Sequence, residues 1–165
     1  MRKLLLIVTA LLFAGSVHAR TGEARALQVN VTARFDWYFR TESYCNACVS
    51  AGCRFNRENY LGLETGFGID THNPNNYYSI PLLADYIHYY PLGKSDKHSV
   101  YVGAEAGLML YYGQWTQDQK SYLDYILFPS GKIGFDFSLG NKGPHLIVGG
   151  QINFWGAGAT LGLSF

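Results

Sequence analysis

The sequence predicts an all-β fold, namely an antiparallel up-and-down transmembrane β-barrel of eight strands. Beyond residue 20, apolar and polar residues alternate with a period of two in one segment after another, which is the pattern of strands with one apolar face. Aromatic residues make up 16% of the chain and charged residues only 15%. No later apolar run approaches the roughly 18 residues of a spanning helix, so a helical membrane protein is excluded.

Residues 1–19 have the features of a secretory signal peptide. Arg2 and Lys3 form a basic start, an apolar segment runs from Leu4 to Ala14, and Val17-His18-Ala19 is a small-residue cleavage site. We therefore expect a signal peptide at 1–19 and a single barrel domain at 20–165. The 13 basic residues include Arg2 and Lys3, so 11 remain against 12 acidic residues. This near balance gives no basic surface for nucleic acid.

The segment from Leu27 to Phe39 is the clearest strand. Its odd positions are all apolar, whereas its even positions carry amides, a hydroxyl, the charged pair Arg34 and Asp36, and Tyr38. A bilayer-crossing strand needs about 9–11 residues and a soluble strand about 5–6. The 13 residues of this segment therefore favour a membrane-spanning strand.

All three cysteines lie at 41–57, where the alternation of large apolar residues stops. We expect this segment to be the first loop of the barrel. Cysteines of an exported protein are expected to form a disulfide. The spacing favours Cys48–Cys53, with Cys45–Cys53 as the alternative, because the two Cα atoms must come within about 4.4–6.8 Å. The loop contains no histidine that would complete a metal site, so no metal or cofactor is expected.

Alternation resumes in the rest of the chain, between turns rich in Gly, Pro and Asn. Strands are predicted at Tyr60–Asp70, Tyr77–Tyr90, His98–Tyr112, Leu146–Phe154 and Ala157–Phe165, and a stretch of constant parity runs from Tyr122 to Leu139. Pro129-Ser130-Gly131 interrupts this stretch, so residues 121–139 form either one strand or two. Two strands would give a barrel of eight and one would give seven, and bacterial barrels have even numbers.

The facing of the strands follows from the size of an eight-stranded barrel, whose interior only just holds side chains. Phenylalanine and tryptophan from several strands would overfill it, so the apolar faces are expected to point to lipid. Glycines and a polar network then fill the lumen. The predicted network comprises Arg34, Asp36, Glu64, Asp85, Glu105, Lys132 and Asp136.

The carboxy-terminal half carries a resemblance to a known family. Ala157-Gly-Ala-Thr-Leu-Gly-Leu-Ser-Phe165 resembles the assembly signal of bacterial outer-membrane proteins, with Phe165 as its aromatic residue. Ser79-Ile-Pro-Leu-Leu83 and Tyr101-Val-Gly-Ala-Glu-Ala-Gly107 are similar to segments of the small outer-membrane β-barrel domain family, which includes OmpX and the OmpA membrane domain. The resemblance implies residence in the bacterial outer membrane, with outer-membrane lipid and the barrel-assembly machinery as partners.

Three classes of function are open. The favoured hypothesis is a structural or surface-recognition barrel that acts through its loops, since loops commonly carry binding sites. A lipid-modifying hydrolase would need a nucleophile and a base within reach on one rim. No catalytic constellation is recognised, because His72, His88, His98 and His145 each lie at a turn or strand end. The third class is a narrow pore or small-ligand carrier, for which eight strands leave little lumen.

Overall fold

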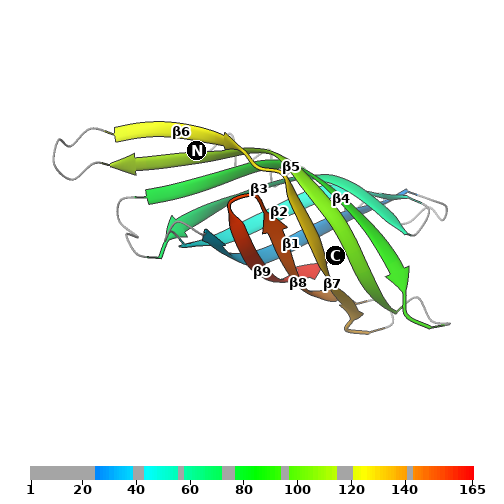
Figure 1. Ribbon diagram of the computed structural model, residues 1–165. Helices are drawn as coiled ribbons and strands as arrows, with labels where there is room; N and C mark the ends of the chain where they lie inside the picture. Colours follow the sequence, from blue (N-terminus) through cyan, green and yellow to red (C-terminus); the bar gives the residue numbers. More distant parts are fainter. Residues whose placement is uncertain are drawn as a thin grey trace.

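The computed structural model describes residues 25–38, 43–55, 58–71, 77–93, 97–114, 121–140 and 143–165 (Figure 1). The predicted signal peptide lies outside these residues. Within the described part of the chain, no helix is long and apolar enough to cross a membrane. The strands are β1 (Arg25–Tyr38), β2 (Ser43–Phe55), β3 (Asn59–Asp70), β4 (Tyr77–Pro91), β5 (His98–Gln114), β6 (Ser121–Leu127), β7 (Ser130–Ser138), β8 (His145–Asn153) and β9 (Gly156–Ser164).

The strands form one closed antiparallel barrel. Neighbours in sequence pair with each other from β1 to β5, β5 pairs with both β6 and β7, and β7, β8 and β9 follow in turn. The barrel closes where β1 pairs with β9, from Asn30 opposite Ser164 to Tyr38 opposite Gly156. Because β6 and β7 occupy one position around the barrel, the nine strands found among the described residues make an eight-position barrel. The predicted fold class is confirmed.

The prediction that 41–57 is the first loop is wrong, because Ser43–Phe55 is strand β2. It pairs along its whole length with β1, and from Tyr44 to Phe55 with β3. Between Cys45 and Cys53, the outward positions of β2 carry small residues, namely Cys45, Ala47, Val49, Ala51 and Cys53. These give a much weaker apolar signal than the Phe and Trp of β1, and the cysteines suggested a stapled loop. Backbone pairing with two long neighbours determines the conformation of this segment.

The predicted disulfide is likewise wrong, since all three cysteines are free. Cys48 is buried in the lumen, whereas Cys45 and Cys53 are exposed on the outer face. Five residues of extended strand separate Cys48 from Cys53 by about 17 Å, well beyond the limit of about 7 Å for a disulfide. The alternative pair, Cys45–Cys53, is farther apart still along the same strand.

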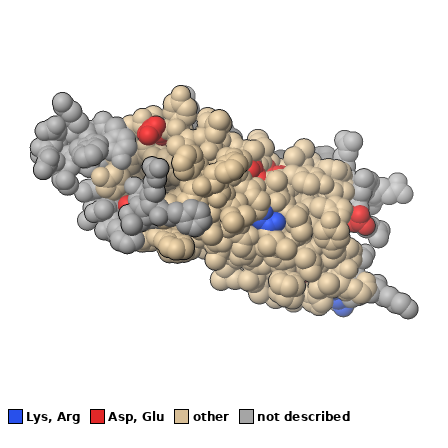
Figure 2. All heavy atoms as spheres, viewed as in Figure 1, with Lys and Arg blue, Asp and Glu red and all other residues tan. Residues whose placement is uncertain are grey.

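The outer face of the barrel is apolar and the predicted charged residues point inward, as expected. Trp37, Leu63 and Ile133 are 54%, 72% and 59% exposed, whereas Arg34, Glu64 and Asp136 are almost fully buried. Figure 2 shows one face of the molecule, on which the few charged residues are scattered over a surface of other side chains. An apolar exterior of this kind is the lipid-facing band of a membrane barrel.

β6 and β7 form one strand that is interrupted at Phe128–Pro129. The register against β5 does not slip at this point, because Leu127 faces Leu108 and Ser130 faces Glu105. Pro129 has no N–H to donate to the ladder, which accounts for the interruption. The stretch from 121 to 139 is therefore one barrel position. The predicted total of eight counted this stretch as two strands and 41–57 as a loop. The total is right because this stretch is one strand position and β2 is an additional one.

β6 has a free edge. The N–H of Phe128 donates to Gly107 O at 3.0 Å, and hydrogen-bonded pairs alternate along antiparallel strands. The backbone groups of Asp124 and Ile126 therefore also point to β5, and those of Leu123, Tyr125 and Leu127 point away from it. No described strand pairs with β6 on that side. In Figure 1, β5 and β6 extend together beyond the short strands β8 and β9.

The facing of β5 predicts the effect of charge on its outer side. Ala104 is exposed next to the buried Glu105. Ala104→Arg should lower the free energy of unfolding by about 2–4 kcal/mol, the cost of a cation near the membrane midplane. Ala104→Leu is the matched control and should have little effect. Urea unfolding in phospholipid vesicles measures both. Equal stability of the two variants would contradict this assignment of the lipid face.

The free edge predicts a pattern of amide protection within β6. The N–H groups of Asp124 and Ile126 are bonded to β5, so they should exchange with solvent deuterons slowly. The N–H groups of Leu123 and Leu127 point to the free edge and should exchange faster. Hydrogen exchange read by NMR in micelles resolves the four amides. Uniform protection along β6 would mean that another segment covers the edge.

Candidate functional site

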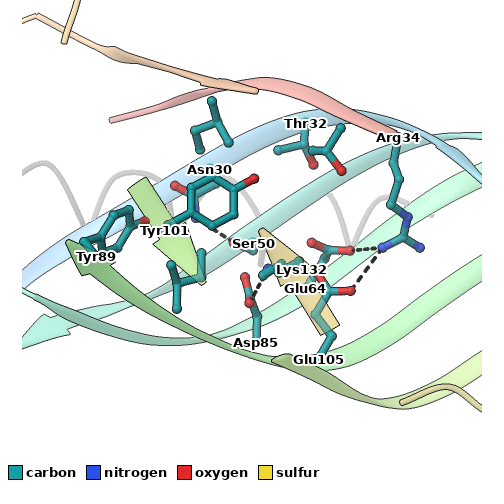
Figure 3. A pocket seen from close by; sticks show the side chains of 13 residues that line it. Asn30, Thr32, Arg34, Ser50, Glu64, Asp85, Tyr89, Tyr101, Glu105 and Lys132 are labelled. Carbon is teal, nitrogen blue, oxygen red and sulfur yellow. Dashed lines mark hydrogen bonds and ion pairs between the residues drawn. The ribbon is translucent and has the colours of Figure 1, made fainter. Parts of the chain in front are cut away.

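Six of the seven predicted lumen residues meet in one charged layer. Arg34 and Asp36 come from β1, Glu64 from β3, Asp85 from β4, Glu105 from β5 and Lys132 from β7. Figure 3 shows five of these side chains converging from the barrel wall. Each is placed there by the period-two facing of its strand.

Arg34 is the centre of the layer. Its Nε lies 2.9 Å from Asp36 Oδ2, and its Nη1 lies 2.8 Å from Glu64 Oε1 and 3.5 Å from Glu105 Oε2. The Arg34 side chain is only 2% exposed. The planar guanidinium suits several carboxylates at once because its donors point in fixed directions. Asp36 also accepts hydrogen bonds from Asn46, at 2.7 Å, and from Gln151.

Lys132 is the second cation. Its Nζ contacts Asp85 and lies 2.9 Å from Glu105 Oε1, which links the two halves of the layer. Gly103 leaves the room that this side chain needs. A Cβ on Gly103 would lie 3.0 Å from Lys132 Cε and 2.5 Å from the backbone oxygen of Tyr86. A larger residue would therefore push the lysine away from its partners.

The carboxylates of Glu64, Asp85 and Glu105 are near enough to one another to hold a cation, with oxygens within 4.8 Å. However, the ammonium group of Lys132 contacts two of the three. The chain's own cation therefore lies where a metal ion would bind. With Asp36, the layer contains four carboxylates and two cations.

Aromatic clusters close the lumen on both sides of the layer. Toward the β6 end the cluster comprises Tyr38, Tyr44, Leu83, Met109 and Phe128, and toward the other end it comprises Tyr60, Ile87, Tyr89, Tyr101 and Ile147. Phe128 is fully buried, and its ring lies 5.6 Å from the Arg34 guanidinium carbon. The cavity between the charged layer and the second of these clusters is about 30 Å³, room for about two water molecules.

The seventh predicted residue, Asp136, is separate from this layer. It is buried, and its Oδ1 lies 2.7 Å from Nδ1 of His145 across the β7–β8 pair. His145 is 30% exposed in its side chain. The pair lies near the end of the barrel opposite β6. On the neighbouring strands, Ser99 of β5 is opposite Asp136 and Ser164 of β9 is opposite His145. Sequence reasoning had placed His145 at a strand end without finding its acidic partner.

The second candidate site is the free edge of β6 with the turn beside it. Leu123, Tyr125 and Leu127 are 70%, 67% and 73% exposed on the outer face of β6. The β8–β9 turn presents Phe154 and Trp155, and its Trp155 N–H donates to Asn153 Oδ1 at 2.8 Å. At the middle of the edge, the Tyr125 N–H donates to Asp124 Oδ1 at 2.7 Å.

Sequence reasoning missed both the Phe128 plug and the free edge. The signal for Phe128 was present, because its even position places it on the same face as Lys132. The free edge could not be found in this way. It depends on β8 and β9 having nine residues each while β5 has 17, which only the pairing reveals.

The charged layer predicts a large cost for removing Arg34. Arg34→Met should lower the free energy of unfolding by about 3–5 kcal/mol, because it leaves buried carboxylates without their cation. Glu64→Gln added to Arg34→Met should restore part of the loss, since it removes one of the uncompensated charges. Unfolding titrations in lipid vesicles test both variants. A double variant less stable than Arg34→Met alone would contradict the predicted ion pairing.

The sequence matches no known family model, and no curated protein is significantly similar to it. Solved structures that are similar in fold include the following three. Neisserial surface protein A shares 13% identity and a TM-score of 0.64, over 84% of this chain and 92% of that one. A de novo designed transmembrane β-barrel has 14% identity and a TM-score of 0.57, over 88% and 97%. The N-terminal β-barrel domain of Pseudomonas aeruginosa OprF has 14% identity and a TM-score of 0.51, over 84% and 97%.

These identities are low, so the likeness establishes the fold and no specific activity. The apolar exterior, the polar lumen and the closed antiparallel topology agree with it. The chain is therefore a small β-barrel of the bacterial outer-membrane type.

Proposed function

We propose that this protein is an outer-membrane recognition barrel that binds an extended peptide segment by strand addition at the free edge of β6. The observation that carries the proposal is the row of backbone groups on Leu123, Tyr125 and Leu127 that points away from β5. Unpaired N–H and C=O groups of an edge strand are complementary to another extended strand.

The position of the edge supports a role outside the membrane. β1 begins and β9 ends at the same end of the barrel, and β6 lies at the other. In bacterial barrels the short turns face the periplasm and the longer connections face outward. The connections at the two ends of this barrel have similar lengths, but β5 and β6 project beyond β8 and β9. We propose on this basis that β6 and the adjoining part of β5 lie on the cell surface, where a partner strand has access to them.

The interior supports recognition rather than transport. The two aromatic clusters and the charged layer fill the lumen, and the cavity between the layer and the second cluster is about 30 Å³. A permeating solute would have to displace buried side chains from all three layers. The barrel wall therefore acts as a rigid support that holds the β5–β6 ribbon in position.

The alternating side chains of β6 would add selectivity to the backbone contacts. Leu123, Tyr125 and Leu127 share the outer face, so a bound strand would extend this apolar row with its own outward residues. Strand addition obtains affinity from main-chain hydrogen bonds and specificity from alternate side chains.

Leu123→Pro tests the proposal because it removes one free-edge N–H and leaves the bonds from Asp124 and Ile126 to β5 in place. The probe is a fluorescein-labelled heptapeptide of alternating threonine and valine. It is added to the full chain in nanodiscs of dimyristoyl phosphatidylcholine, and anisotropy is measured. Leu123→Pro should weaken binding at least about tenfold, whereas Leu123→Ala, which keeps the N–H, should change it much less.

A peptide N-methylated on alternate amides is the ligand control and should not bind. Heat-modifiable gel migration checks that each variant still forms the barrel. Equal binding by the parent and by folded Leu123→Pro would exclude strand addition at β6.

A further inference from the structure

We infer that Asp124 determines the charge of the segment that β6 accepts, and that the partner strand places a basic residue opposite this carboxylate. The inference rests on the proposed function and names the chemistry of its partner. It comes from a different observation, the contact between Asp124 and the backbone of the edge itself.

The free edge is capped by the chain at its middle. The Tyr125 N–H points away from β5 and donates to Asp124 Oδ1 at 2.7 Å. A side chain that satisfies an edge amide protects the strand from unspecific pairing. An incoming strand has to take over this N–H with its own carbonyl group, which releases the carboxylate of Asp124.

The released carboxylate then faces the incoming strand at short range. The backbone of Asp124 is bonded to β5, so toward the free side Asp124 occupies a non-hydrogen-bonded position. Residues opposite each other at such positions have Cα atoms about 4.5 Å apart and the closest side chains. A lysine or arginine there would pair with Asp124, whereas an acidic residue would be repelled.

The same carboxylate disfavours a second copy of the chain as the occupant. If Leu123 of one copy bonded to Tyr125 of another, antiparallel pairing would place the two Asp124 residues directly opposite each other. Like charges at directly opposed positions destabilise a strand pair. Asp124 therefore favours a heterologous basic segment over self-association.

Three heptapeptides of alternating threonine and valine, differing only in a central lysine, threonine or glutamate, test the inference. They are titrated into the full chain in the same nanodiscs. The lysine peptide should bind about fivefold more tightly than the glutamate peptide, the upper range for one exposed charge pair. Asp124→Asn should remove this preference, and Asp124→Lys should reverse it.

Glu58→Lys is the matched control, because Glu58 is exposed and precedes β3 at the opposite end of the barrel. It makes the same change in net charge and should leave the preference unaltered. If all peptides bind the parent equally and Asp124→Lys changes nothing, the inference is wrong while strand addition stands. If no peptide binds the parent, the proposed function fails with it. A parent chain that dimerises in dilute detergent, and loses the dimer in Leu123→Pro, would assign the edge to a second copy and overturn the inference.

Discussion

Backbone hydrogen bonding is the constraint on which the rest of this structure depends. Hydrocarbon offers no partner for an N–H or C=O group, so strands in a membrane must pair on both sides. β1 through β5 and β7 through β9 meet this requirement in a closed ring. Ring closure fixes which residues point inward, and charged side chains in the small lumen must then pair with one another because little water reaches them. The charged layer is thus a consequence of closing eight strand positions.

β6 is the exception to this rule, and its position explains why it is tolerated. β6 and β7 follow one line along β5, β6 toward the rim and β7 within the barrel wall. The short strands β8 and β9 do not reach as far as β6. Its edge groups can be unpaired only where water reaches them, so β6 belongs at the rim and not within the hydrocarbon. The strands of the barrel wall are paired on both sides and can lie in lipid, whereas β6 is paired on one side and has to meet water at the other.

The sequence predicted the facing of the strands much better than the position of each strand along the chain or the strands it pairs with. Leu27–Phe39 was recognisable because Phe and Trp alternate with polar residues. Ser43–Phe55 has the same period, but its outward residues are small and include two cysteines, so the apolar signal was weak. The inward position of Arg34 followed from parity alone. Its contacts with Glu64 and Glu105 did not, because they depend on the stagger between strands that are distant in sequence.

The seam between β1 and β9 has a consequence for how the barrel forms. Every other strand pair among the described residues joins neighbours in sequence or spans only β6, so those pairs can form locally as hairpins. The seam joins Asn30 to Ser164, and bringing such distant segments together carries the largest loop-closure entropy. Arg34 lies on β1, and Gln151 on β8 reaches Asp36 across this seam. Until the seam closes, these groups remain hydrated. Closure of the seam is therefore the step that removes these interior charges from water.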